Sequence, residues 1–369
     1  MQVVEGSPVA KTSAGAGEIL TAIALAAFGF LITAGVLHAS IRDPLHLHAD
    51  VRSEKLFMME QWRGKVFSAA FGTSHVHNGL DPRAFDAALT GSPAATRTAN
   101  FAIEGGSQSE QFVMATEFLK HLEVPAQAGA PAQPCIVMLE LGAGSNFTTD
   151  HLVHPRAINI YDWPTAKLIS HFVSPQMGTG QRFGRIGYAM AAMGLHYSNV
   201  GMLSNEIFSP PLNQDILSNQ TADDRRGELV EPVRTVRTHT IYDIIDHHLQ
   251  RPVITPGQTL AGNAEIIERL AVGSPVRNVS FVYVVMPRLE DLNTAADYPD
   301  HLSVAGPHGS LDVPILNMAR ADRYPQMYDP TLWFDDSHLA GNGAQTLSTL
   351  LAAQLKAWYL AHGGPPPCG

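Results

Sequence analysis

Cysteines and basic residues are both scarce in this sequence, and each shortage argues against a class of protein. Only two of the 369 residues are cysteines, which is too few for a disulfide framework or a cysteine-type zinc site. We expect Cys135 to be a small core residue and Cys368 to move freely in a Pro/Gly-rich tail. The net charge is -10, with no compensating cluster of Lys or Arg. This argues against nucleic-acid binding, which requires a basic surface to replace the counterions on phosphates.

Long hydrophobic runs are also scarce, and the single one lies near the N-terminus. Residues 19–37 carry no charge and are about long enough to cross the hydrocarbon core of a bilayer as a helix. We therefore expect a disordered segment over 1–17, a transmembrane signal anchor over 18–38 and a juxtamembrane connector over 39–64. A cleaved signal peptide would have a shorter apolar core and small residues at its cleavage site. A fully buried core helix is the remaining alternative.

The rest of the chain alternates short apolar runs with segments of helical periodicity. Its 45% hydrophobic and 16% charged residues are typical of a globular protein with a large core. The alternation predicts an α/β fold, here a three-layer α/β/α sandwich around a mostly parallel sheet. We place this domain at 65–362, with an insertion at about 149–271 and a flexible tail at 363–369. The expected strands lie at 66–71, 98–103, 135–141, 279–286 and 313–316, and the expected helices at 83–89, 110–121, 166–172, 184–195, 262–270 and 344–361.

Ser74 is the candidate nucleophile. It ends a Gly-Thr-Ser turn after the first expected strand, and polar and turn residues follow it before the helix at 83–89. A serine at the carboxyl end of a strand, facing a helix N-terminus, lies where backbone N–H groups converge and can stabilise an oxyanion. A serine that only caps the helix is the alternative.

The other parts of an acyl-transfer site follow other expected strands. A serine nucleophile needs a base, for which His338 is the candidate, and Asp335 could fix the tautomer of that imidazole. The backbone N–H groups of Ser74 and Gly105 and the side-chain amide of Asn146 are candidate oxyanion donors. Because the carboxyl ends of parallel strands meet at one edge of a sheet, we expect these groups to lie together. A surface loop with one histidine is the alternative for Asp-x-x-His.

The mechanism needs neither a metal nor a cofactor, and we expect none. His46, His48 and Asp50 offer possible metal ligands, but no partner ligands for them are evident in the sequence.

Four blocks of the sequence, in this order, resemble those of the SGNH (GDSL-like) hydrolase superfamily. They are Gly-Thr-Ser at 72–74, Asn-Phe-Ala-Ile-Glu-Gly at 100–105, Gly-Ser-Asn at 144–146, and Asp-Asp-Ser-His at 335–338. The resemblance implies an SGNH/flavodoxin-like fold in which Ser74, Gly105, Asn146 and His338 carry catalysis, with Asp335 as the triad acid.

Three positions depart from the blocks of that superfamily. Thr73 stands in place of the usual acid, Ala102 in place of the middle glycine, and Phe147 in place of the final aspartate of the third block. The resemblance covers about residues 65–147 and 279–360.

Within the superfamily the layout looks like a membrane-anchored, exported branch that includes alginate O-acetylation proteins and the D-alanyl-lipoteichoic acid protein. In that branch one N-terminal span precedes the serine turn, and a Gly-x-Asp-Pro-like stretch follows it, here at 79–82. The resemblance implies a serine esterase or O-acyltransferase that acts on acyl groups, principally O-acetyl, of an extracellular or cell-surface polysaccharide. It also implies a single-pass inner-membrane protein with a periplasmic catalytic domain, working beside a membrane-bound O-acyltransferase.

Charge counting gives the opposite orientation. Lys11 is the only basic residue before the span, whereas Arg42, Arg52 and Lys55 follow it. By the positive-inside rule the C-terminal domain would then lie in the cytoplasm.

Two other functions remain open. The protein could be a membrane-tethered lipid or small-ester hydrolase, which an acyl-chain pocket lined by Met190, Met193 and Leu195 would favour. It could instead be a non-catalytic scaffold of a polysaccharide export or acylation complex. The position of Ser74 relative to His338 distinguishes the scaffold from an enzyme.

Overall fold

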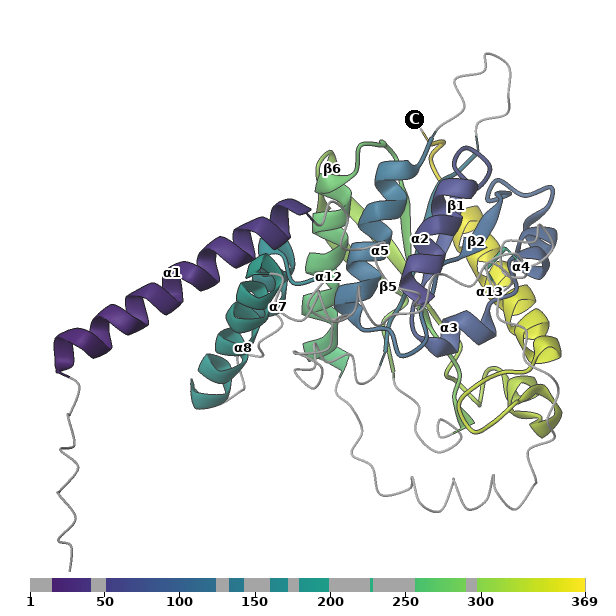
Figure 1. Cartoon of the computed structure of the whole chain (residues 1–369). Helices are drawn as coiled ribbons and strands as arrows, with labels where there is room; N and C mark the ends of the chain where they lie inside the picture. The colour runs from purple at the N-terminus through teal and green to yellow at the C-terminus, as the bar shows by residue number, and fades with distance from the viewer. Residues whose placement is uncertain are drawn as a thin grey trace, which may run out of the picture.

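The computed structural model in Figure 1 is an α/β domain with one apolar helix projecting from it. The α/β class predicted from the sequence is confirmed, as is a mostly parallel sheet. The structure describes residues 15–40, 51–123, 133–142, 160–171, 179–198, 226–227, 256–289 and 297–368.

The sheet has six strands in the order β2-β1-β3-β4-β6-β5. All neighbouring pairs are parallel except β5 and β6, which form an antiparallel edge. The chain runs from β1 to one edge at β2 and then returns to the other side of β1 at β3. The β1/β3 junction is therefore the point where the strand order reverses, and ligands of open α/β sheets bind at the carboxyl ends of strands beside such a point. The strands are β1 (Ser68–Phe71), β2 (Thr98–Asn100), β3 (Ile136–Glu140), β4 (Ser280–Val285), β5 (His301–Gly306) and β6 (Gly309–Asn317).

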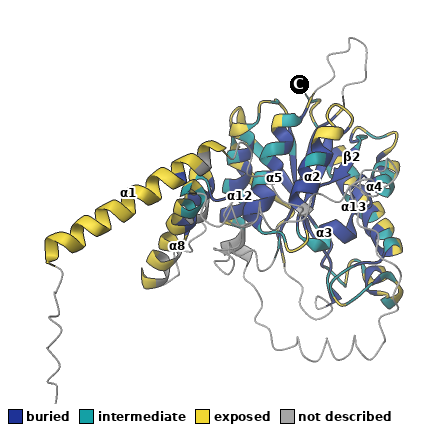
Figure 2. Cartoon of the chain, viewed as in Figure 1, coloured by how far each residue is buried: buried dark blue, intermediate teal, exposed yellow. Residues whose placement is uncertain are grey.

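Both faces of the central strands are buried. On β3, Val137 and Leu139 belong to one hydrophobic cluster, whereas Ile136 and Met138 belong to another. This explains why the strand is a continuous apolar run rather than an alternating one. Figure 2 shows the buried strands between helices that are buried on their inner sides.

Two main sets of helices add side chains to these clusters. The first cluster takes side chains from α2 (Val51–Gln61), α5 (Gln108–His121) and α12 (Pro256–Gly273), which lie in front of the sheet in Figure 1. The second takes side chains from α3 (Ser74–Gly79), α4 (Pro82–Leu89) and α13 (Gly341–Ala361). The remaining helices of the domain are α7 (Trp163–His171), α8 (Thr179–Ser198) and the short 3-10 turns Pro325–Tyr328 and Pro330–Leu332.

Two segments that the sequence analysis placed outside the core contain core helices. Residues 39–64 are predicted to be a connector, but they contain α2, whose Leu56, Met58 and Met59 are buried in the first cluster. The predicted insertion at 149–271 includes most of α12, which is also part of that cluster. Both helices are core elements because α2 packs against α5, and α12 packs against α5 and β5.

The C-terminal tail is not free. Cys368 forms a disulfide with Cys135 at the start of β3, with 5.3 Å between their Cα atoms. The backbone N–H of Cys368 also donates to Gln133 O at 3.1 Å. The expectation of a freely moving Cys368 in a flexible tail is therefore wrong, because two residues separated by 233 positions are adjacent in the fold.

The projecting helix is α1 (Ala16–Ser40). Its segment Ala16–Val36 has a mean hydropathy of 2.3 and is long and apolar enough to cross a membrane. Most of its described side chains are exposed.

Candidate active site

The first strand ends in a turn that fixes Ser74 at the start of α3. Gly72 follows β1, and a Cβ on it would lie 2.6 Å from Glu140 Oε2, so no larger residue fits there. Thr73 is the N-cap of α3, and its hydroxyl oxygen accepts the N–H of His75 at 3.2 Å. The residues after Ser74, predicted to be a turn, form this short helix.

The Gly-x-Asp-Pro stretch starts the next helix. Asp81 is the N-cap of α4, and its carboxylate accepts the N–H groups of Arg83 and Ala84 at 2.8 and 3.2 Å. Pro82 occupies the first helical position, where a missing N–H costs nothing. The motif therefore has a local structural reason, independent of any chemistry.

Asn100 connects the second strand to α3. Its buried side-chain amide donates to Val76 O, His77 O and Leu80 O at 2.8 to 3.3 Å. These carbonyls belong to the end of α3, where helical partners are lacking. The chain then runs along the serine turn, since Ile103 N donates to Gly72 O at 3.0 Å. This places Gly105, with a φ of 60°, beside Ser74.

His338 and Asp335 lie on a closed loop between the 3-10 turn Pro330–Leu332 and α13. Trp333 at its start is fully buried, and it pairs with Leu339 at its end in an antiparallel bridge. Gly343, in the first turn of α13, packs against the backbone carbonyl of Leu332 where a Cβ would collide. The loop is thus anchored to the core at both ends.

Within this loop the aspartate holds the histidine. His338 Nδ1 lies 2.9 and 2.8 Å from the two oxygens of Asp335, and the backbone N–H of His338 donates to Oδ1 at 2.7 Å. Partial burial alone would raise the pKa of Asp335, but hydrogen bonds from His338 and from backbone N–H groups lower it below its ordinary value. The carboxylate is ionised and can only accept, so Nδ1 carries the proton. The other nitrogen, Nε2, lies on the edge of the ring away from Asp335.

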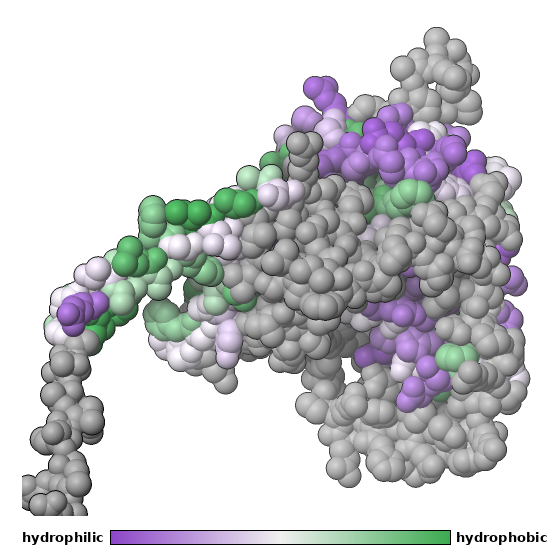
Figure 3. Space-filling view, in the orientation of Figure 1, coloured by the Kyte–Doolittle hydropathy of each residue, from purple (hydrophilic) through white to green (hydrophobic). Residues whose placement is uncertain are grey.

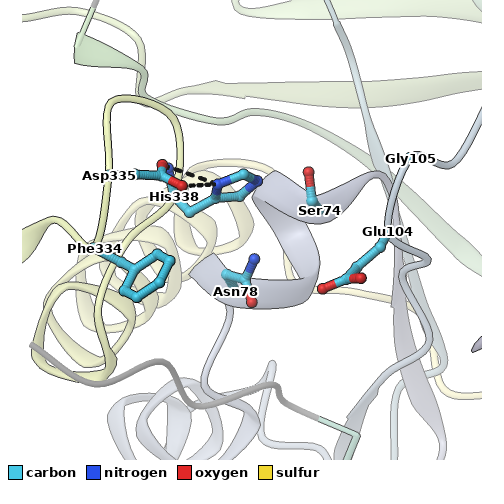
Figure 4. Close-up of a pocket in the computed structure, with 7 residues that line it drawn as sticks. All are labelled: Ser74, Asn78, Glu104, Gly105, Phe334, Asp335 and His338. Carbon is cyan, nitrogen blue, oxygen red and sulfur yellow. Dashed lines mark hydrogen bonds and ion pairs between the residues drawn. The ribbon is translucent and has the colours of Figure 1, made fainter.

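The serine, the histidine and the aspartate line one pocket of about 360 Å³ (Figure 4). In Figure 4 the outer edge of the His338 ring is directed toward Ser74 across the pocket. No hydrogen bond joins the two side chains in the part of the chain that the structure describes. Such bonds are often long in an enzyme without substrate. The complete lining is Ser74, Asn78, Glu104, Gly105, Phe334, Asp335 and His338.

Four of the five predicted site residues are therefore adjacent. Ser74, Gly105, Asp335 and His338 come from three separate segments and meet at the carboxyl ends of the strands. Asn146, with its Gly-Ser-Asn block, lies outside the described residues, as do His46, His48 and Asp50.

A second histidine–carboxylate pair adjoins the pocket, and the sequence did not reveal it. Glu140, at the end of β3, accepts His75 Nδ1 and Thr73 Oγ1 on Oε1, both at 3.2 Å, and Thr73 N on Oε2 at 2.6 Å. The His75 ring lies nearly parallel to the His338 ring, with 5.8 Å between centroids. The only available signal was an acidic residue, Glu140, in an otherwise apolar strand.

This second carboxylate is also charged. Burial alone would raise the pKa of Glu140, but the hydrogen bond and charge of His75 and the donors of Thr73 outweigh burial and lower it below its ordinary value. A buried charge of this kind is tolerated only when its oxygens are hydrogen-bonded. Here those bonds rigidify the turn that carries Ser74.

Two further polar side chains line the pocket. Asn78 lies one helical turn after Ser74 and is 4% exposed, and its Oδ1 has no hydrogen-bond partner among the described residues. Glu104 precedes Gly105 and directs its carboxylate into the same space (Figure 4). The spacing of Asn78 from Ser74 could have identified the former, once α3 was recognised as a helix.

The three residues predicted to line an acyl-chain pocket do not lie at this site. Met190 is exposed on α8, Met193 and Leu195 are partly buried, and none of the three lines the pocket at Ser74.

Comparisons with known protein families, with curated proteins and with solved structures found no match for this chain.

Proposed function

We propose that this chain is a membrane-anchored serine esterase or O-acyltransferase of the SGNH type, with a three-layer α/β/α catalytic domain. Its substrates would be acyl groups, principally O-acetyl, on an extracellular or cell-surface polysaccharide. One observation carries the proposal: the Nδ1 edge of His338 is held by Asp335, and the other edge of its ring faces Ser74 across a polar pocket at the carboxyl edge of the sheet.

In the first half-reaction, Ser74 Oγ attacks the ester carbonyl carbon while His338 Nε2 takes the hydroxyl proton. Asp335 stabilises the imidazolium that forms. The negative oxygen of the tetrahedral intermediate is held by the N–H groups of Ser74 and Gly105, with Asn146 as the proposed third donor. The intermediate collapses when the sugar oxygen leaves with the proton from His338, and the acyl group remains on Ser74.

The second half-reaction uses the same groups in reverse order. His338 takes a proton from water or from a sugar hydroxyl, whose oxygen attacks the acyl-serine. The released carboxylic acid or acylated sugar departs as Ser74 recovers its proton. Transfer would require a bound sugar to exclude water from the acyl-serine.

Thr73 stands where the superfamily has an acidic residue, but another carboxylate reaches the serine turn. Glu140 reaches the turn from β3 and accepts both the N–H and the hydroxyl of Thr73. A carboxylate thus stands beside the nucleophile although the residue before Ser74 is a threonine.

The lining of the pocket supports a small acyl group on a sugar over a long lipid chain. Of its seven residues only Phe334 has a large apolar side chain, whereas Asn78 and Glu104 offer hydrogen-bonding groups suited to hydroxyls. A lipid hydrolase would need an extended apolar groove beside Ser74, so a lipid or simple ester remains the second candidate.

The Cys135–Cys368 disulfide supports an extracytoplasmic domain, because disulfides persist in oxidising compartments. This weighs against the orientation given by charge counting. With α1 as its span, the protein would be a single-pass inner-membrane protein with a periplasmic domain. A membrane-bound O-acyltransferase that delivers the acyl group is the proposed partner.

The test is hydrolysis of p-nitrophenyl acetate by the full chain in detergent micelles, with Ser74→Ala and His338→Ala beside it. We expect both variants to lose activity by about a thousandfold or more. Ser337→Ala is the matched control, since its hydroxyl bonds only the exposed Asp336 at 3.1 Å, and it should keep full activity. Wild-type activity that survives both substitutions would refute the serine mechanism. A wild type without activity on this or acetylated sugar esters would favour the scaffold.

A further inference from the structure

Exposed apolar side chains outside α1 are concentrated on one part of the domain. Among the described residues, eight large apolar side chains beyond α1 are exposed, and six of them lie on α7 and α8. The other two, Val272 and Leu360, lie on α12 and α13. The six, which we call the α8 surface, are Trp163, Phe183, Ile186, Tyr188, Met190 and Tyr197.

The α8 surface is continuous with the membrane helix. α8 packs alongside the C-terminal part of α1, and Ala34 is the only side chain described as buried in α1. In Figure 3 the hydrophobic colour of α1 extends onto the neighbouring helix. A helix that packs along part of a membrane span lies at the same depth as that part.

The composition of α8 also fits a lipid surface. Its 20 residues include three aromatic residues and two arginines but no carboxylate residue, in a chain with a net charge of -10. Its domain-facing side is made by small residues, Ala189 and Ala192, which are buried. Helices with small buried contacts, exposed aromatics and basic residues are typical of the membrane interface. Exposed apolar side chains that cluster in this way, rather than standing singly, mark an interaction surface.

We propose that the α8 surface is seated in the membrane beside α1, so that the protein contacts lipid through two elements. The domain would then have a fixed orientation on the bilayer instead of swinging on a single tether. This inference rests on α1 spanning the membrane and is independent of the chemistry at Ser74.

The experiment places a fluorescent label at three exposed positions of the full chain. Phe183→Cys, Phe28→Cys and Leu360→Cys are each labelled with an NBD dye and reconstituted in phosphatidylcholine and phosphatidylglycerol vesicles. Phe183 on α8 is 71% exposed, and Phe28 on α1 and Leu360 on α13 are each 63% exposed. Their substitution therefore removes little packing. The native cysteines are joined in a disulfide and do not react.

We expect a quencher carried on the lipid acyl chains to quench the label at 183 about as strongly as at 28, and to leave the label at 360 unquenched. Quenching at 28 with none at 183 would overturn the inference while leaving α1 as an anchor. No quenching at 28 would overturn the membrane span and the inference together. A label at 183 that is shielded from aqueous iodide and from the lipid quencher would instead indicate a protein partner, and would also overturn it.

Discussion

Replacing Glu140 by glutamine removes a buried charge while conserving the size of the side chain. In the wild type its two oxygens accept three donors from Thr73 and His75 at 2.6 to 3.2 Å. Glutamine keeps one acceptor, which can stay with Thr73 N. Its NH2 group, which can only donate, then faces Thr73 Oγ1 and His75 Nδ1 in place of the acceptor Oε1. The substitution therefore removes the acceptor that both groups share and weakens every bond that the charge of Glu140 had strengthened.

The magnitude follows from those bonds. Hydrogen bonds to a charged group contribute about 1.5–3 kcal/mol each, and glutamine weakens rather than abolishes them, so we expect a loss of about 2–4 kcal/mol in the free energy of unfolding at neutral pH. The pKa of Glu140 is lower in the folded chain than its ordinary value of 4.5. Its contribution is thus complete above that value and is lost as the pH falls through the folded pKa. The difference between wild type and variant should shrink under those acid conditions.

The assay is urea unfolding of the full chain in detergent micelles, at neutral pH and at pH values below 4.5, the ordinary value of Glu140. Glu117→Gln on α5 is the control, because Glu117 pairs with the exposed Lys120 at the surface. Such pairs contribute only about 0–1 kcal/mol. Asp335 also titrates in acid, but it is present in every protein compared. A neutral-pH difference no larger than that of the control, or one that does not shrink in acid, would refute the role assigned to Glu140.

Two further predictions concern the stability of the domain. Cys368→Ser removes a cross-link between residues 233 positions apart and should lower the free energy of unfolding by about 3–5 kcal/mol. Wild type treated with dithiothreitol should lose the same amount. Reduced wild type with an unchanged free energy of unfolding would contradict this. Lys55 is buried and donates to Asn100 O, and burial lowers its pKa from 10.5 to about 7 although Glu54 and Glu104 oppose the shift. Between those values only the unfolded chain holds the proton, so stability should rise with pH by up to about 1.4 kcal/mol per pH unit. Lys55→Met should abolish this rise in urea titrations, and equal slopes in both proteins would contradict the assignment.

Local features of the chain could be read from the sequence. The apolar run of α1, the buried strand β3 and the cap of α4 depend on residues that are consecutive or a few positions apart. The Asp335–His338 contact has the same character, because the two residues are three positions apart on one loop. Short-range patterns of this kind report transfer free energy, capping and turn geometry directly.

The edge strand β5 and the helices α2 and α3 were not predicted from the sequence. Two of these elements, β5 and α2, lack the periodic apolar pattern on which such predictions depend. Only Val304 of β5 is buried, so the strand lacks an apolar alternation. The periodicity of α2 is interrupted by Arg52 and Lys55, which are fully buried against the fold. Tertiary contacts here override the pattern that burial normally imposes on a sequence.

The sequence by itself determined the α/β class, the apolar helix α1 and the identity of Ser74, Asp335 and His338 as candidates. Only the tertiary structure decided that these residues share a pocket, that Cys368 pairs with Cys135, and that Glu140 holds the serine turn through His75. The physical reason is that these contacts join residues far apart in the chain, up to 233 positions for the cysteines and 65 for Glu140 and His75. Their proximity depends on the order of strands in the sheet, which no local pattern of residues encodes.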